Sequence, residues 1–284
     1  MQQFALKCLR SVIYSNAFIA FNAAFLTHVS LILDSNRVPD IRISILVFLA
    51  TWLVYNLHRL AKHEYIFYRN QKHYPQPLFS IYGNVLITAA TLIGITFLGV
   101  QLISPKTLLS TSPLIILALL YSAKILKINK KTVAIRELPF AKIFLIAFSW
   151  AFITYSLPVH LQSQKPLLEL LDTHFLMRFI FIFSITIPFD IRDLKYDTDE
   201  QKTIPSVIGT QNALHLSRFL FFGFLLISLW VDYQLFFCLL PLSIFALYLI
   251  SICKNKGDLF FTGLMDGLIL LKGLSIGGYL FFLS

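Results

Sequence analysis

The sequence predicts an all-α integral membrane protein with nine transmembrane helices, and two observations lead to this prediction. Of the 284 residues, 57% are hydrophobic and only 13% are charged, and the mean hydropathy is +0.74. Soluble domains carry about 25% charged residues. Apolar runs of about 17 to 25 residues, long enough to cross a hydrocarbon core of about 30 Å, recur along the chain. Because backbone groups cannot stay unpaired in lipid, such runs predict helices rather than strands.

Nine apolar runs make up the predicted spans. They cover approximately 11–33, 42–58, 80–102, 108–124, 138–160, 174–190, 214–231, 233–252 and 259–282. The first is too long for a signal-peptide core and has no convincing cleavage site, so we expect it to remain as the first span. Polar connections between the runs are short, which predicts a single membrane domain over 1–284. Cys8, Cys238 and Cys253 match no ligand spacing and are expected to be packing residues.

The distribution of lysine and arginine predicts how the helices cross the membrane, since cytoplasmic loops collect positive charge. With the N-terminus inside, the outer loops receive only Arg37, Arg42, Lys106 and Lys165. Nine crossings then put the C-terminus outside. This topology and attraction to anionic lipid explain most of the net charge of +10. We expect a bacterial inner (plasma) membrane location and no nucleic-acid partner, because the basic residues are scattered among loops.

An acidic run directly follows the sixth apolar run. It contains Asp190, Asp193, Asp197, Asp199 and Glu200. Carboxylates crowded at the edge of a membrane helix repel one another, which is tolerated best when a cation sits among them. The first three stand at i, i+3 and i+7 and share one helical face. Because Mg²⁺ takes oxygen ligands from carboxylates and phosphates, the run predicts half of a metal and diphosphate site. A solvated acidic helix end is the alternative interpretation.

A second polar motif follows the second apolar run, on the same predicted side of the membrane. Asn56 ends this run as Asp190 ends the sixth, and Arg59, His63 and Glu64 come after it. Two such motifs suggest a duplicated helical unit with a site between its halves. We expect His63 to be an interfacial loop residue rather than a ligand or a base.

These motifs resemble those of the UbiA superfamily of intramembrane prenyltransferases, whose members have nine helices and two Asp-rich motifs on the cytoplasmic side. The family's second motif, DxxDxxxD followed by TLP or TIP and a glycine, stands here as Asp190, Asp193 and Asp197, then Thr203, Ile204, Pro205 and Gly209. The first motif departs from the family pattern: Asn56 fits and Glu64 replaces an aspartate, but Leu60 occupies the middle position. Tyr121 and Ser122, followed by Lys124 and Lys127, resemble the family's Tyr-Ser and Lys segment.

The resemblance implies a UbiA-like bundle with a central apolar cavity open near the cytoplasmic face. It implies transfer of a prenyl group from a polyprenyl diphosphate to a lipophilic, often aromatic acceptor. The catalytic residues would be Asp190, Asp193, Asp197 and Asn56, and Mg²⁺ would be held by these four and Glu64. Arg59, Lys124, Lys127 and Lys202 would bind the diphosphate, with Arg69, Lys130 and Lys131 as further candidates. The Phe-rich interior would shelter the prenyl chain.

Two other functions stay open at this point. The incomplete first motif suits a catalytically silent homologue that binds an isoprenoid diphosphate. A membrane transporter would also carry polar residues between repeated helical units, although carboxylates gathered at one membrane face suit a diphosphate better than alternating access.

Polar residues within the spans have structural interpretations. Asp266 and Lys272 in the ninth span are six residues apart, so we expect contacts with other helices rather than with each other. Asn16 and Asn22 are expected to form interhelical hydrogen bonds. Arg178, near the outer end of the sixth span, is expected to extend its guanidinium toward the membrane surface.

Overall fold

A computed structural model describes residues 12–13, 15–34, 38–69, 81–120, 124–128, 131–134, 140–195 and 203–283. Side chains are described at 12–13, 15–34, 38–57, 85–112, 140–195 and 203–282.

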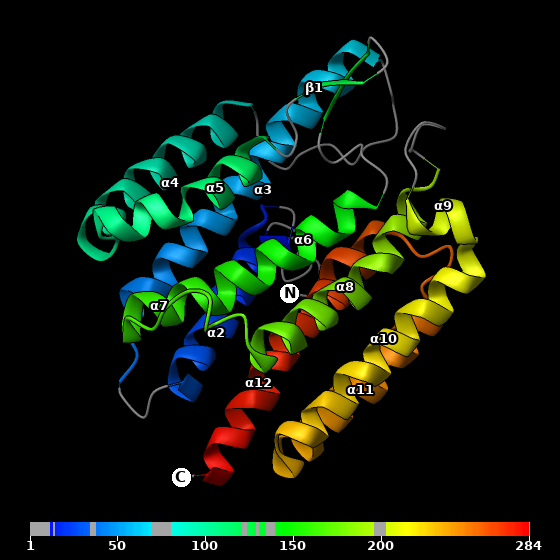
Figure 1. The fold of residues 1–284 in the computed structure, drawn as a ribbon. Coiled ribbons are helices and arrows are strands. Elements are labelled where there is room, and N and C mark those ends of the chain that lie inside the picture. Colours follow the sequence, from blue (N-terminus) through cyan, green and yellow to red (C-terminus); the bar gives the residue numbers. More distant parts are fainter. Residues whose placement is uncertain are drawn as a thin grey trace, which may run out of the picture.

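Helices form almost all of this part of the chain (Figure 1). In chain order they are α2 (Ala17–Asp34), α3 (Ile41–Arg69), α4 (Ile81–Leu102), α5 (Pro105–Leu120), α6 (Ala141–Ala151), α7 (Leu157–Ser163), α8 (Thr173–Asp193), α9 (Ile204–Ile208), α10 (Thr210–Val231), α11 (Tyr233–Ile252) and α12 (Asp266–Leu283). This part of the chain also has two π-helical turns. The turn η2 (Phe152–Ser156) joins α6 to α7, and the turn η3 (Phe260–Met265) leads into α12.

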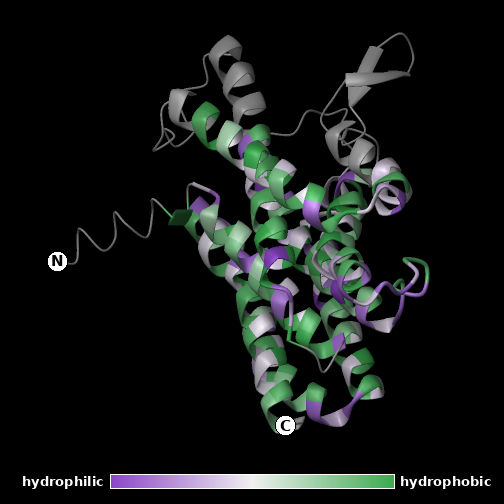
Figure 2. Cartoon of the chain, turned by 90° about the vertical axis from the view of Figure 1, so that its left-hand side faces the viewer, coloured by the Kyte–Doolittle hydropathy of each residue, from purple (hydrophilic) through white to green (hydrophobic). Residues whose placement is uncertain are grey.

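Each predicted span falls on a helix, so the all-α membrane fold is confirmed. Within the described residues, seven helical segments are long and apolar enough to cross a membrane, and the apolar part of α3, Ile41–Leu57, is shorter. Figure 2 shows that hydrophobic residues occupy most of the length of these helices. On α4, Ile93 and Val100 are 72% and 81% exposed, as expected for lipid-facing residues. The fourth span was predicted to reach residue 124, but α5 ends at Leu120.

A short hairpin adds to the all-α prediction. Strands β1 (Lys124–Ile128) and β2 (Lys131–Ala134) pair antiparallel, with Ile128 opposite Lys131. Lys124, which was predicted to end the fourth span, therefore lies in a strand. The hairpin and α9 both lie toward the same end of the bundle, whereas the C-terminus lies at the other end (Figure 1).

A ring of neighbouring helices surrounds the main hydrophobic core. In order around it, α2 packs against α12, α12 against α11, α11 against α10, α10 against α8, and η2 contacts both α8 and α2. The core includes Phe181, Phe221 and Phe224, all fully buried and in edge or tilted ring contact. On the outside, α3 packs along α2, and α4 packs along α3. The predicted central cavity stays a prediction.

Helix α8, which leads to the acidic run, is braced from α10. Asp172 caps its first turn by accepting from the Phe175 N–H at 3.0 Å. Pro188 has no N–H to donate to the carbonyl of Ser184, four residues earlier. Ser217 on α10 fills this gap, since its hydroxyl donates to the Ser184 carbonyl at 2.8 Å, and the Ser184 hydroxyl donates to the Ser217 carbonyl at 2.6 Å.

Ser217→Ala is expected to lower the free energy of unfolding by about 1 to 2 kcal/mol, because the buried Ser184 carbonyl loses its donor. Thermal unfolding of the purified protein in detergent measures this. Ser228→Ala is the matched control, since Ser228 is also buried on α10 but bonds its own helix at Leu225. Equal effects of the two substitutions would contradict the bracing role of Ser217.

The prediction for Arg178 is wrong: its side chain is buried in the bundle, with the residue 4% exposed. The guanidinium donates to the carbonyl and hydroxyl of Thr154 and to the hydroxyl of Ser30. Pro158, four residues after Thr154, has no N–H to offer that carbonyl. A backbone acceptor exposed by a proline therefore draws the arginine inward.

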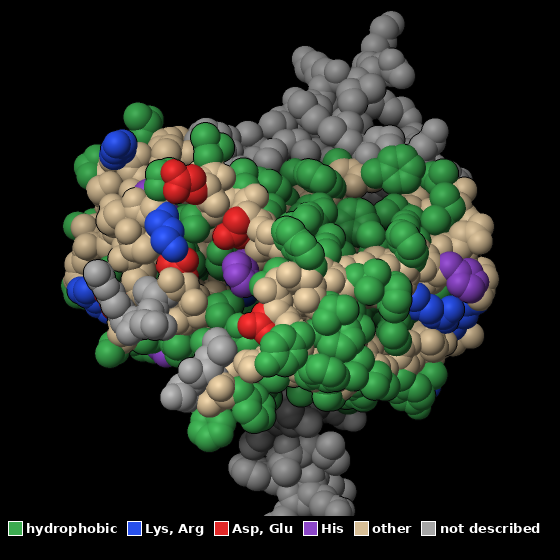
Figure 3. Space-filling model, turned by 60° about the horizontal axis from the view of Figure 1, so that its bottom comes forward, with side chains coloured by type: hydrophobic (Ala, Val, Ile, Leu, Met, Phe, Trp, Pro, Cys, Tyr) green, Lys and Arg blue, Asp and Glu red, His purple; other side chains and the backbone are tan. Residues whose placement is uncertain are grey.

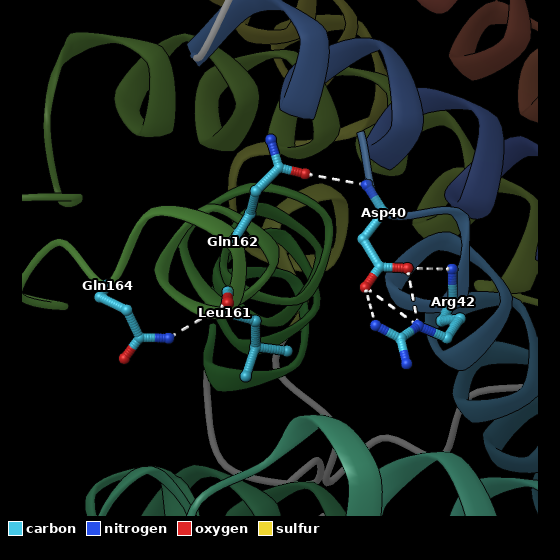
Figure 4. A network of polar contacts seen from close by, with 5 residues as sticks. All are labelled: Asp40, Arg42, Leu161, Gln162 and Gln164. Atoms are coloured by element: carbon cyan, nitrogen blue, oxygen red, sulfur yellow. Dashed lines mark hydrogen bonds and ion pairs between the residues drawn. The ribbon is translucent and has the colours of Figure 1, made fainter. Parts of the chain in front are cut away.

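At the end of the bundle that carries the C-terminus, charged side chains gather on one side, beside a broad hydrophobic area (Figure 3). Lys165 pairs with Asp34 at 2.6 Å. Gln162 accepts from the backbone N–H of Asp40 at 3.1 Å, and Arg42 pairs with the Asp40 carboxylate at 2.7 Å (Figure 4). The hydrogen bond from Arg42 lowers the pKa of Asp40. These contacts join α7 to the connection between α2 and α3.

Candidate active site

Two of the predicted carboxylates meet one cation at the end of α8. Asp190 and Asp193 lie in its last turn, and Asp190 is 1% exposed. Nζ of Lys142, from the first turn of α6, lies 2.7 Å from Oδ1 of Asp190 and 3.7 Å from Oδ2 of Asp193. The i, i+3 spacing thus directs both acids to the same place, as predicted. Burial of Asp190 without this cation would be costly.

Lys142 is the residue that the sequence interpretation missed. It was counted only among the basic loop residues that set the topology. Its position four residues after the start of the apolar run 138–160 is the signal that could have distinguished it, because a lysine there must find an acid or reach water.

Arg192 supplies a second positive charge at this site. Its Nε donates to Oδ1 of Asp193 at 2.8 Å, and its Nη1 lies 3.8 Å from Asp258. The guanidinium also lies over the rings of Phe189 and Phe261, with 5.3 and 5.1 Å to the ring centroids. Cation–π contact and the ion pair together hold Arg192 beside Asp193.

The segment after the acidic run fixes α6 against α8. Ile204 packs with Ile143, Ile187 and Ala213 in a small buried cluster. Gly209 separates α9 from α10 with φ +82°, a backbone conformation that only glycine adopts without strain. Since Ile143 follows Lys142 and Ile187 lies one turn before Asp190, this cluster sets the distance between the two charged groups.

Asn56 lies elsewhere in the hydrogen-bond network. It is fully buried on α3; its Nδ2 donates to the Trp52 carbonyl at 2.8 Å, and its Oδ1 lies 3.5 Å from Nδ2 of Asn16. Among the residues described, it makes no hydrogen bond to Asp190 or Asp193. The prediction that Asn16 forms an interhelical hydrogen bond is confirmed, because Asn56 belongs to α3.

Several predicted site residues lie outside the described side chains. They are Arg59, Glu64, Arg69, Lys124, Lys127, Lys130, Lys131, Asp197 and Lys202. Arg59, Glu64 and Arg69 belong to α3, Lys124 and Lys127 to β1, and Lys131 to β2. Helix α8 ends at Asp193, so the shared face on this helix covers Asp190 and Asp193 alone.

The donor chemistry at the end of α8 fits a hard cation. Carboxylate oxygens of Asp190 and Asp193 already hold the Lys142 ammonium, a cation supplied by the chain itself. Within the residues described, no three His, Cys, Asp or Glu side chains gather closely enough to form a metal site by themselves. Of the five predicted magnesium ligands, two therefore meet here, Asn56 contacts neither, and Asp197 and Glu64 lie outside the described side chains.

These features define a mainly helical integral membrane protein with an acidic and basic cluster at one end of the bundle. The fold is similar to that in the apo structure of a UbiA homolog from Aeropyrum pernix K1, with a TM-score of 0.60 over 94% of this chain and 97% of that chain. The two sequences are 13% identical, so the similarity concerns the fold. The expected UbiA-like fold is confirmed. No family model and no curated protein matches the sequence.

Proposed function

We propose that the protein is an intramembrane prenyltransferase, which moves a prenyl group from a polyprenyl diphosphate to a lipophilic acceptor. The observation that carries the proposal is the convergence of Asp190 and Asp193 on a single cation at one end of a UbiA-like bundle. The fold by itself would not support the proposal, because proteins with one fold can have different functions. The site end is proposed to face the cytoplasm, where the basic loops gather.

In this proposal Mg²⁺ would be held by Asp190 and Asp193 together with Asp197, Glu64 and Asn56. A Mg²⁺ ion held there would supply positive charge to neutralise the diphosphate and to stabilise the charge that grows on it as a leaving group. Lys142 and Arg192 keep the carboxylates in place before the ligand arrives, and Arg59, Lys124, Lys127 and Lys202 bind the remaining diphosphate oxygens.

The aromatic side chains beside Arg192 suit the second half of the reaction. Phe189 and Phe261 face Arg192, and their rings lie 5.4 Å apart. Apolar and aromatic surroundings exclude water, so the allylic cation meets the acceptor rather than a water molecule.

A second candidate is a homologue that binds the diphosphate without turnover. It is favoured by Lys142, which neutralises Asp190 without any metal, and by Leu60 in the first motif. In this case the acids serve the stability of the bundle more than catalysis.

Incubation of the purified protein with prenyl diphosphates, Mg²⁺ and aromatic acceptors distinguishes the candidates. We expect Mg²⁺-dependent binding and transfer, and EDTA should slow transfer on the order of 100-fold or more, since the metal contributes several kcal/mol. Product and released diphosphate are quantified in parallel. Binding without product supports the silent homologue. A full rate in EDTA excludes the metal, and the absence of both binding and turnover would contradict the proposal and leave transport open.

A further inference from the structure

Asp266 is an acidic residue inside a membrane-spanning segment that the site described above does not use. It is the first residue of α12, is half-buried, and belongs to the span Phe260–Phe282. Within the described part of the chain its carboxylate makes no hydrogen bond and no ion pair. Because charge at this depth is costly, an unpaired carboxylate indicates a function that requires it.

The backbone around Asp266 is built to hold its side chain in a set direction. The π-helical turn η3 ends directly before it, and the Asp266 N–H donates to the carbonyls of Gly263 and Phe261. From α2, Asn22 donates through Nδ2 to the Asp266 carbonyl at 2.9 Å. Single π-helical turns are often found at functional sites. Packing of an aspartate at that position does not require a distorted turn that is fixed by a neighbouring helix.

Asn22 supports the same interpretation. It is fully buried, and its Oδ1 has no hydrogen-bond partner among the residues described. Asn22 therefore bonds the Asp266 backbone through Nδ2 only, and its amide oxygen is left as an unused acceptor. Two acceptors without donors, one on α2 and one on α12, suit a ligand that brings hydrogen-bond donors.

Asp266 is connected to the proposed diphosphate site through Arg192 and η3. Arg192, which pairs with Asp193, lies over the ring of Phe261 at 5.1 Å, and Phe261 belongs to η3, the turn that leads into Asp266. Asp258, on the other side of Arg192, is exposed at the bundle surface. Asp266 follows Asp258 by about two helical turns and is therefore deeper in the membrane. An acceptor that attacks the prenyl carbon from below the diphosphate would meet Asp266.

We propose that Asp266 is a further catalytic residue, whose carboxylate binds the hydroxyl of a hydroxylated aromatic acceptor and takes its proton. This inference rests on the proposed transferase function. The acceptor O–H bond breaks and its proton passes to Asp266. The prenyl carbon–oxygen bond breaks and its electron pair leaves with the diphosphate, and the ring carbon then forms a bond to the resulting allylic cation. Return of the ring proton to the acceptor oxygen completes the product, so the net proton remains on Asp266. Asn22 acts as a positioning residue.

The test compares Asp266→Asn with Asp258→Asn, which removes the same charge from the exposed neighbour of Arg192. Purified full-length protein is given Mg²⁺, a prenyl diphosphate, and a panel of hydroxylated benzenes and naphthalenes with their methyl ethers. We expect Asp266→Asn to lower transfer at least about 100-fold. Mg²⁺-dependent binding of the prenyl diphosphate should stay near that of the wild type, as should transfer by Asp258→Asn. Methyl ethers should be poor acceptors for the wild type.

Should Asp266→Asn fail to fold, Asn22→Ala replaces it, with an expected loss of transfer of about 10-fold or more from misplacement of the carboxylate. Wild-type transfer together with unchanged transfer by Asp266→Asn, or by Asn22→Ala in its place, would overturn the role of Asp266 and leave the transferase function standing. Absence of Mg²⁺-dependent diphosphate binding by the wild type would overturn both.

Discussion

Asp193→Ala is expected to reduce prenyl transfer at least about 100-fold while the protein stays folded in membranes. Asp193 offers a carboxylate to the shared cation position, but its side chain is 25% exposed, so its loss leaves no large cavity. The same substitution at Asp190 would be harder to interpret, because Asp190 is buried against Lys142. Rates of product formation at saturating prenyl diphosphate, with and without added Mg²⁺, measure the effect.

Asp258→Ala is the matched control for this experiment. Asp258 also approaches Arg192, but from the start of the last helical segment and with a side chain that is 47% exposed. We expect its replacement to leave transfer almost unchanged. Transfer retained by Asp193→Ala would remove the end of α8 from the site, whatever the control shows.

Lys142→Met is expected to lower the free energy of unfolding by about 3 kcal/mol, because Asp190 stays buried with its cation removed. The Lys142 side chain is 26% exposed and that of Asp190 is 2% exposed, so the carboxylate cannot simply turn to water. Thermal unfolding in detergent gives the change. Lys142→Arg keeps the charge and should cost much less.

A double substitution separates charge pairing from packing. In Lys142→Met with Asp190→Asn, neither group is charged, and most of the lost stability should return. Mg²⁺ should also raise the unfolding midpoint of Lys142→Met more than that of the wild type, because it can take the vacated place. If the double variant loses as much free energy of unfolding as the two single variants lose in sum, the pairing of Lys142 with Asp190 does not explain the instability of Lys142→Met.

Hydropathy was sufficient to predict the helices, because the requirement for paired backbone groups in lipid leaves few alternatives. The span 233–252 coincides with α11, Tyr233–Ile252. Errors arose where a local contact decides the structure. The hairpin at Lys124–Ala134 has no long apolar run, and Arg178 turns inward to a carbonyl that Pro158 leaves free.

The candidate site was predictable in part. Periodicity placed Asp190 and Asp193 together, because both lie in one helical turn. It could not reveal Lys142, since pairing between α6 and α8 depends on how the two helices pack. Asn22 was correctly expected to bond another helix, although its partner is the Asp266 carbonyl rather than a side chain. Lys272 was expected to make a polar contact, yet its ammonium lies over the Phe181 and Phe224 rings.

The hydrogen bonds exchanged between Ser184 and Ser217 imply that substitutions outside the site can change the activity of the protein. Pro188 removes one backbone hydrogen bond from α8 just before its acids. The direction of the last turn of α8 therefore depends on the neighbouring helix α10. Substitutions on α10 at positions that do not contact a ligand can therefore change the turnover rate. A random mutagenesis screen would find them as a cluster around Ser217, remote from the chemistry.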